Sequence, residues 1–464
     1  MQTTQVTPRL CLLSAVLAAF VLNATTHAAE AAPAASSGWT KPAWLTDLAV
    51  SAKETYDDNV LGVSGLGMPL KSSWVSSFSL KLGLNFVPLL DKGSAVKTFT
   101  LVYQPEKFSF DNFSSEDYTA HRLGVVLKGK SGNFTFSLDN AFLFVDGSKV
   151  APTYALNQLA GVAANQNDKF RNNYAHSLAR ERRNQSQDRY TIQAQYTSGN
   201  VFIRPISSLT MFNLNTYLRN TGAAPYKGYQ DYVDRYDVNG GLDFGYKLTP
   251  DLSVTLGYRD GYQYQQRFAP AINSDQHYAS GSYQRVLVGL EGKLSKDVTV
   301  KLAAGPDFRD YNTHAAMNNL HTTRYYAEGS VTVAVAPDQS LAFNYKKWVF
   351  VASTGLVPYV DTTVGLTYHW TVNKQWGFDA GLKLLEADYT MGNDVAGSGP
   401  SRRDDLDYGA SLGLSYAFTP HLLVTATYNT DTGKNGAKNL PATLFADYRL
   451  FEHNVTAVSV QYKF

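Results

Sequence analysis

The chain has 464 residues, and its 41 Lys and Arg nearly balance its 39 Asp and Glu, so no basic excess points to a nucleic-acid partner. Charged residues make up 17% of the chain and aromatic residues 13%, including 30 Tyr. The one cysteine, Cys11, lies within an export signal that is expected to be removed, which excludes disulfides in the mature chain.

The N-terminal residues are typical of a Sec signal peptide. Arg9 precedes a short apolar run from Leu10 to Leu22, and a segment rich in small residues follows it. No later stretch reaches the roughly 18 apolar residues of a membrane helix. We therefore expect a signal peptide over residues 1–28, a periplasmic linker over 29–45 and one barrel domain over 46–464.

Apolar and polar residues alternate through the mature chain. The pattern is clearest over residues 76–86, 236–248 and 406–418, where apolar side chains occupy every second position. Successive side chains of a strand point to opposite faces, so each segment predicts a strand with one apolar face and one polar face. The segments are roughly 10 to 14 residues long, enough for a tilted strand to cross a membrane.

Short turns and long polar loops separate these segments in alternation. Short turns such as those within 248–254 and 418–424 fall after even-numbered strands, and loops such as 391–404 fall after odd-numbered ones. This layout predicts an all-β fold, a transmembrane antiparallel up-and-down β-barrel of about 18 strands with both termini in the periplasm. Because residues 201–232 are weakly patterned, about 16 strands is the alternative.

The chain ends on an alternating apolar strand with a terminal aromatic residue. This segment, residues 455–464, resembles the C-terminal assembly signal of outer-membrane barrels, and the side chains that carry the resemblance are Val458, Val460, Tyr462 and Phe464. The resemblance implies the cell outer membrane as the location. It also implies the barrel assembly machinery, outer-membrane lipid and lipopolysaccharide as partners.

A second resemblance lies at the start of the first expected strand. The segment AVSAKETYDDNVLG, residues 49–62, is similar to a family of β-barrel porins of Gram-negative bacteria that is often associated with exopolysaccharide gene clusters. The resemblance implies a barrel and a role in the passage or export of polar material. It implies no catalytic residue.

The polar face of the strands predicts a water-filled lumen, because barrels of 16 to 18 strands leave an aqueous channel. Both signs of charge occur on it, so we expect weak ion selectivity. The residues expected to face the lumen are Lys81, Asn85, Asp243, Lys247, Arg259, Arg285, Glu291 and Lys301. Glycines such as Gly245, Gly257 and Gly289 share this face and are expected to keep the lumen open or to let the strands bend.

Aromatic residues gather beside the short turns on the opposite, apolar face. They predict a girdle at the periplasmic membrane boundary, where amphipathic rings are favoured. Its expected members are Tyr246, Tyr368, Trp370, Trp376, Tyr416, Phe418, Tyr462 and Phe464.

The longest loop, about residues 146–188, is the third external loop and is rich in basic residues. By analogy of position with general porins, we expect it to fold inward and narrow the lumen. The alternative is a solvated surface flap that touches acidic lipopolysaccharide. The residues of the expected constriction are Lys169, Arg171, Arg180, Arg182 and Arg183.

Motifs for catalysis, metals or cofactors are weak. Residues 124–131 match the P-loop pattern, but the middle of the match and the residues that follow it are both predicted to be strand. A P-loop needs a helix there, so we interpret the match as chance. The histidines lack metal-ligand spacing. Asp57, Asp58 and Asn59 could bind a cation, but an Asx-type turn at a strand end is the favoured interpretation. We expect no cofactor and no metal.

These observations predict a pore for the passive passage of small polar solutes. The alternative is an accessory component of polysaccharide export or surface assembly, which an inward track of sugar-stacking aromatic rings would favour. An outer-membrane enzyme is a second alternative and lacks a catalytic constellation, so we expect no enzyme.

Overall fold

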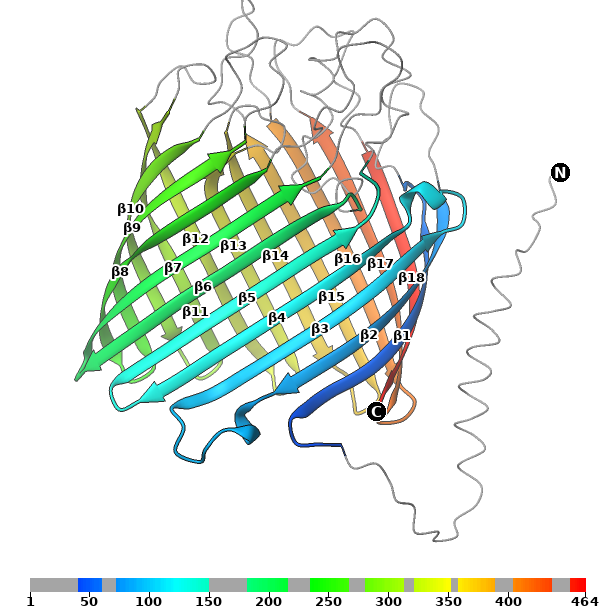
Figure 1. Cartoon of the computed structure of the whole chain (residues 1–464), viewed down its shortest axis with the longest axis horizontal. Helices are drawn as coiled ribbons and strands as arrows, with labels where there is room; N and C mark the ends of the chain where they lie inside the picture. The colour runs from blue at the N-terminus through cyan, green and yellow to red at the C-terminus, as the bar shows by residue number, and fades with distance from the viewer. Residues whose placement is uncertain are drawn as a thin grey trace, which may run out of the picture. The chain divides into compact units, whose positions relative to one another are not determined.

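The computed structural model describes residues 41–60, 72–149, 182–215, 234–266, 280–312, 321–351, 358–388, 404–435 and 451–464. Over these residues, 18 antiparallel strands form one closed sheet, as predicted (Figure 1). The described residues include two short 3-10 helices, η1 (Val87–Leu89) and η2 (Ser114–Glu116). None of the described helices is long and apolar enough to cross a membrane.

Each strand pairs with its neighbours in the sequence, and β1 also pairs with β18. The strands are β1 (Leu45–Asp57), β2 (Ser73–Asn85), β3 (Val96–Phe110), β4 (Tyr118–Ser131), β5 (Phe134–Asp146), β6 (Gln185–Ser198), β7 (Val201–Leu214), β8 (Arg235–Thr249), β9 (Leu252–Gln265), β10 (Gly281–Lys293), β11 (Val298–Tyr311), β12 (His321–Ala336), β13 (Gln339–Phe350), β14 (Tyr359–Thr371), β15 (Trp376–Asp388), β16 (Asp404–Ala417), β17 (Leu422–Asn435) and β18 (Phe451–Lys463). The weakly patterned part of the chain does contain β7, so the alternative of about 16 strands is wrong.

Large apolar side chains cover the outside of the barrel. Val288 is 67% exposed and Leu382 is 59% exposed, while residues adjacent to them in sequence turn inward. In water such exposure would be costly, because apolar surface gains free energy when it leaves water. A closed barrel with an apolar outer face satisfies its backbone hydrogen bonds internally and suits the interior of a membrane.

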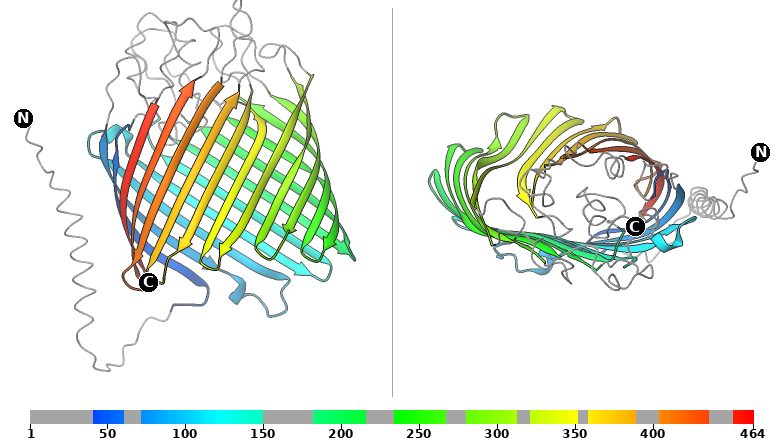
Figure 2. Two further views of the ribbon diagram at one scale, coloured as in Figure 1. Left: turned by 180° about the vertical axis from the view of Figure 1, so that it is seen from behind. Right: turned by 90° about the horizontal axis from the view of Figure 1, so that it is seen from above.

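The short turns lie at one end of the barrel (Figures 1 and 2). Gly132 and Gly199 take positive φ angles of 56° and 58° in the turns that follow β4 and β6, a backbone conformation that glycine adopts without steric cost. The P-loop-like segment lies within β4, which confirms it as strand. The pairing of β4 with β5 continues past Gly129, which is in register with Phe136, up to Ser131 and Phe134.

Outward aromatic side chains form contacts beside the short turns. Trp376 and Tyr416 face each other across β15 and β16 with ring centroids 4.5 Å apart, and Tyr416 also contacts Phe418 edge-on at 4.6 Å. Tyr462 and Phe464 make the same kind of edge contact at 5.0 Å. These expected members of the girdle therefore lie on the apolar face, as the alternation predicted.

The last strand closes the barrel against the first. Val50 is in register with Tyr462, and the pairing continues up to Asp57 and Val455. The terminal residue takes part, because the backbone N–H of Phe464 donates to the carbonyl of Leu48 at 2.9 Å. No edge of the sheet is left unpaired at this seam.

A side-chain network holds the other end of the seam. The carboxylate of Asp58 accepts hydrogen bonds from the backbone N–H of Asn454 at 2.7 Å and from its side-chain amide at 2.8 Å. The side-chain amide of Asn59 donates to the carbonyl of Glu452 at 2.8 Å. Residues of the first strand end thus bind directly to the last strand.

We predict that the contact between Asp58 and Asn454 stabilises the closed barrel. Replacing either residue with Ala should lower the free energy of unfolding, and a double-mutant cycle should give a coupling energy of about 1.5–3 kcal/mol, the usual contribution of a hydrogen bond to a charged group. Urea unfolding followed by tryptophan fluorescence measures it. Strictly additive effects of the two substitutions would show that the pair does not couple β1 to β18.

Candidate functional site

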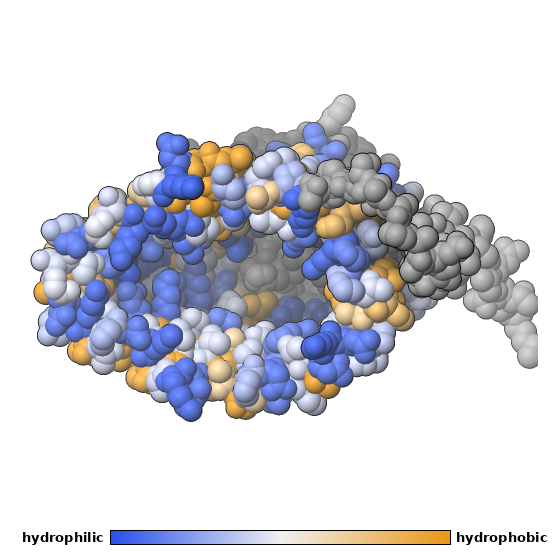
Figure 3. Space-filling model, turned by 90° about the horizontal axis from the view of Figure 1, so that it is seen from below, coloured by the Kyte–Doolittle hydropathy of each residue, from blue (hydrophilic) through white to orange (hydrophobic). Residues whose placement is uncertain are grey.

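The inside of the barrel is polar and hollow. Figure 3, seen from the end that carries the short turns, shows hydrophilic side chains around an opening. A cavity of about 1030 Å³ lies within the lumen against strands β4 to β14. Its wall carries six Lys or Arg and five Asp or Glu side chains, so both signs of charge are mixed, as the sequence indicated.

A ladder of ion pairs runs across the cavity wall from β7 to β10. Arg204 donates to Asp243 at 3.0 Å and binds the carboxylate of Glu291 through two nitrogens at 2.8 and 3.0 Å. Arg259 binds the other oxygen of Asp243 at 2.7 Å. Because each charge has an opposite partner on the wall, this ladder projects little net field into the lumen.

Similar pairs line other parts of the lumen. Lys53 and Arg122 bind the two oxygens of Glu106 at 3.1 and 2.9 Å, between β1, β3 and β4. Lys383 of β15 binds Asp431 of β17 at 2.8 Å. Charges on inward positions are thus frequently held by a partner on a nearby strand.

Inward glycines provide space for the side chains of neighbouring strands. A Cβ atom added to Gly245 would collide with the ring of Phe202, and one added to Gly257 would collide with Oδ1 of Asp243. The ring and the carboxylate therefore lie flat against the wall, over the glycine. This packing keeps bulky residues out of the lumen, which is the first of the two roles that the sequence suggested for these glycines.

A second, buried network of hydrogen bonds lies farther from the short turns than the ladder does. The carboxylate of Asp237 accepts hydrogen bonds from the hydroxyl of Tyr283 at 2.8 Å and from the amide of Gln263 at 2.6 Å. Arg309 donates to the amide oxygen of Gln263 at 2.9 Å and to Asp307 at 2.9 Å. This network ties β8, β9, β10 and β11 together on the inner face.

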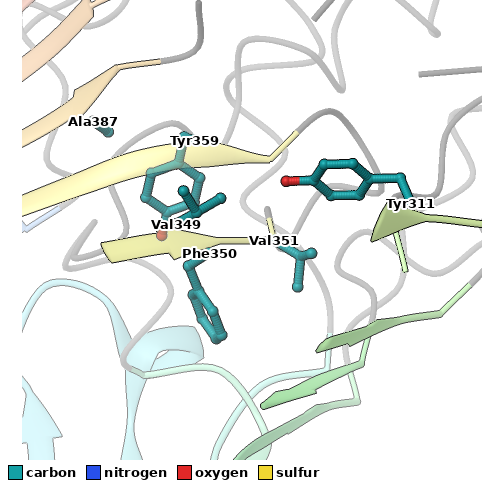
Figure 4. Packing of buried hydrophobic residues seen from close by; sticks show 6 residues of the cluster. All are labelled: Tyr311, Val349, Phe350, Val351, Tyr359 and Ala387. Carbon is teal, nitrogen blue, oxygen red and sulfur yellow. The ribbon is translucent and has the colours of Figure 1, made fainter. Parts of the chain in front are cut away.

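The end of β13 bends inward to meet this network. We call residues Val349, Phe350 and Val351 the bridge; all three are buried (Figure 4). The carbonyl of Val349 accepts hydrogen bonds from Gln263 at 2.8 Å and from Arg309 at 3.1 Å. β13 is not a neighbour of β9 or β11 in the sheet, so the bridge crosses part of the lumen.

The far side of the bridge rests on β7 and β8. The carbonyl of Val351 accepts a hydrogen bond from Arg235 at 2.7 Å, and the ring of Phe350 lies 6.1 Å from that of Phe212. The barrel has an elongated outline seen from above (Figure 2), which brings β13 toward these strands. The bridge narrows the lumen, and the sequence analysis did not anticipate it.

The eight residues predicted to face the lumen lie in different places in the structure. Five of them line the cavity: Asp243, Arg259, Arg285, Glu291 and Lys301. Lys81 lies apart and binds Asp47 at 2.6 Å. The side-chain oxygen of Asn85 accepts a hydrogen bond of 3.1 Å from the backbone N–H of Val87, at the start of η1. Lys247, near the end of β8, does not line the cavity.

Only part of the expected loop constriction is described. Arg182 and Arg183 are buried and both bind the carboxylate of Glu116, at 3.3 and 2.8 Å, and Arg182 also donates to the carbonyl of Val60. Two of the five positive charges are thus compensated by a carboxylate. The other three, on Lys169, Arg171 and Arg180, lie outside the described residues.

One group of side chains has the composition of a cation site. Asp57, Asp58 and His453 bring ligand atoms within 4.8 Å of one another. These atoms already have partners: His453 Nε2 lies 2.9 Å from Asp57 Oδ1, and Asn454 satisfies Asp58. The Asx-type turn is present, with Oδ1 of Asp57 accepting a hydrogen bond from the backbone N–H of Asn59. A cation would have to replace these hydrogen bonds.

No protein-family model and no curated protein matches the sequence. Similar solved structures are OccAB3 of Acinetobacter baumannii (TM-score 0.38, 11% identity, covering 90% of this chain and 98% of that chain) and the ferric citrate transporter FecA (0.38, 10%, 91% and 80%). A third is OccK2 of Pseudomonas aeruginosa in complex with glucuronate (0.38, 12%, 90% and 98%). At these scores the similarities carry no argument about function.

We predict that the ladder sets the ion preference of the wall. Replacing Asp243 with Asn removes the counter-charge of Arg259 and one of the two partners of Arg204, so the reversal potential in a KCl gradient should shift toward anion preference. The matched control is Asp260→Asn, because Asp260 lies on the outward face of β9, beyond exposed Tyr258. If Asp243→Asn conducts with the wild-type reversal potential, the ladder does not control selectivity.

Proposed function

We propose that the protein is an outer-membrane channel for the passive passage of small polar solutes. The observation that carries the proposal is the closed barrel of 18 strands with an apolar outside and a hollow, charged inside. A barrel of this strand number encloses more space than its own side chains fill, which leaves room for water and solutes. The export signal and the aromatic contacts near the short turns support the outer membrane as its location.

The alternative proposal, an accessory role in polysaccharide export, has less support from the inner face. An inward indole could stack on sugar rings, but Trp348 lies between Lys346, whose ammonium is 3.8 Å from the ring centroid, and Phe350, whose ring stacks at 4.4 Å. Its two faces are therefore covered. The pairing of the inward charges also agrees with a pore that has no enzymatic activity, because these side chains bind one another and thereby stabilise the wall.

The direct test is single-channel recording in a planar lipid bilayer. Refolded protein that migrates differently on a gel before and after boiling should give stepwise conductance, and neutral sugars in the bath should reduce it as they enter the pore. The boiled sample is the control. Folded protein that inserts in the bilayer without conducting would contradict the proposed channel. This result would not decide whether the protein takes part in polysaccharide export.

We further propose that the long external loop contributes positive charge to the lumen. Replacing Lys169, Arg171 and Arg180 with Ser leaves the pairs that Arg182 and Arg183 form with Glu116 intact. If the loop folds inward, the change should shift the reversal potential toward cations at 0.1 M salt and much less at 1 M, where the Debye length falls from about 10 Å to about 3 Å. An unchanged reversal potential at both salt concentrations would place these charges outside the lumen.

A further inference from the structure

The lumen holds two classes of cation, distinguished by whether a carboxylate binds them. Arg204 and Arg259 of the ladder are bound by the carboxylates of Asp243 and Glu291. Near the bridge, Arg309 is bound by Asp307, but Lys346, Arg235 and Arg189 lie on aromatic rings and form no ion pair among the described residues. A ring holds a cation through its quadrupole and carries no net charge, so it leaves the positive charge uncompensated.

The rings and cations near the bridge form a continuous row. Lys346 lies over Trp348, which stacks on Phe350. The guanidinium of Arg235 lies 4.5 Å from the ring centroid of Phe350 and 4.8 Å from that of Phe212. Arg189 lies over the same Phe212 ring at 5.7 Å. The row runs from β13 through β8 and β7 to β6, with a cation at either end.

The two end cations, Arg189 and Lys346, both line the cavity. Within the described part of the chain, neither forms an ion pair with a carboxylate. Arg235, in the middle of the row, is buried and donates to the bridge carbonyl of Val351, so it reinforces the local positive charge without being accessible itself. An anion in the cavity could therefore form an ion pair with either end cation.

Carboxylates near the end cations act against such an anion, and three of them, Glu328, Asp361 and Asp237, interact electrostatically with Lys346. Glu328 is in register with Lys346 on the neighbouring strand, and Asp139 lies on β5, next to the strand of Arg189. Neither binds the two end cations within ion-pair distance. They make the site selective for a ligand that contacts the end cations directly, because a diffuse attraction would be cancelled.

We propose that Arg189 and Lys346 form a binding site for small hydroxylated oxyanions, compounds that bear a carboxylate or a phosphate. The inference rests on the proposed channel function and names its preferred class of solute. A guanidinium binds either oxyanion through two parallel hydrogen bonds. The cavity, at about 1030 Å³, has room for a ligand of this kind, since small-molecule sites usually measure roughly 300–1,000 Å³. Neighbouring polar groups such as Asn239 and Ser330 supply partners for hydroxyl groups.

Fluorescence of Trp348 provides a test that does not depend on conduction. An anion that binds Lys346 and moves its ammonium away from the indole ring changes the environment of Trp348. The folded protein in detergent is titrated with gluconate, inorganic phosphate and glucose, and the signal of a Trp348→Phe variant is subtracted. Gluconate or phosphate should give a saturable change, and the stronger of the two identifies the preferred oxyanion. Glucose at the same concentrations should give none.

Four further variants separate the site from general lumen charge. Lys346→Gln and Arg189→Gln should each weaken oxyanion binding about tenfold or more, the loss expected for one charged hydrogen bond. Glu328→Gln should strengthen binding, because it removes the competing carboxylate. Lys383→Gln, a lumen cation that Asp431 already neutralises, should leave the titration midpoint unchanged.

Equal responses to glucose and to the oxyanions, or an equal loss in Lys383→Gln and Lys346→Gln, would overturn the proposed site. So would a channel that conducts but shows no saturable oxyanion signal, and that result would leave the channel function standing. Oxyanion binding in a folded protein that does not conduct would have the opposite meaning: the site would exist and the channel function would fail.

Discussion

Closure of the sheet on itself is the constraint on which the rest of this structure depends. In lipid an unpaired backbone N–H or C=O has no water to bind, so an open edge between β1 and β18 would cost several kcal/mol for each group. The pairing of these strands removes that cost, down to the N–H of Phe464 on the carbonyl of Leu48. The carboxylate of Asp58 on Asn454 then secures the far end of the same seam.

Closure of the sheet also places many side chains in a confined lumen. Every second residue must point into the lumen, and many of these residues are charged or bulky. The ladder of Arg204, Asp243 and Glu291 satisfies charges against one another, and the glycines Gly245 and Gly257 let a ring and a carboxylate lie flat. The hollow that remains is therefore a product of side-chain packing as much as of strand number.

The strands could be predicted from the sequence because a two-residue period is a local signal, and even the weakly patterned β7 follows β6 directly after a short turn. Several inward residues followed from the same period. The bridge could not be predicted, because the contact between Val351 and Arg235 joins strands that are distant in sequence and are not neighbours in the sheet. The partners of the Asp57–Asn59 stretch could not be predicted either, because they lie on β18, at the other end of the sequence.

The bridge is held largely by its main chain. Gln263 and Arg309 bind the carbonyl of Val349, and Arg235 binds that of Val351, so the identity of either valine is irrelevant to these three hydrogen bonds. Both valine side chains are fully buried, so substitutions there would change the packing while these hydrogen bonds remain. Loss of a donor on β8, β9 or β11 would instead leave a buried carbonyl without a partner. The course of the backbone through the narrow part of the passage is therefore set by side chains on distant strands.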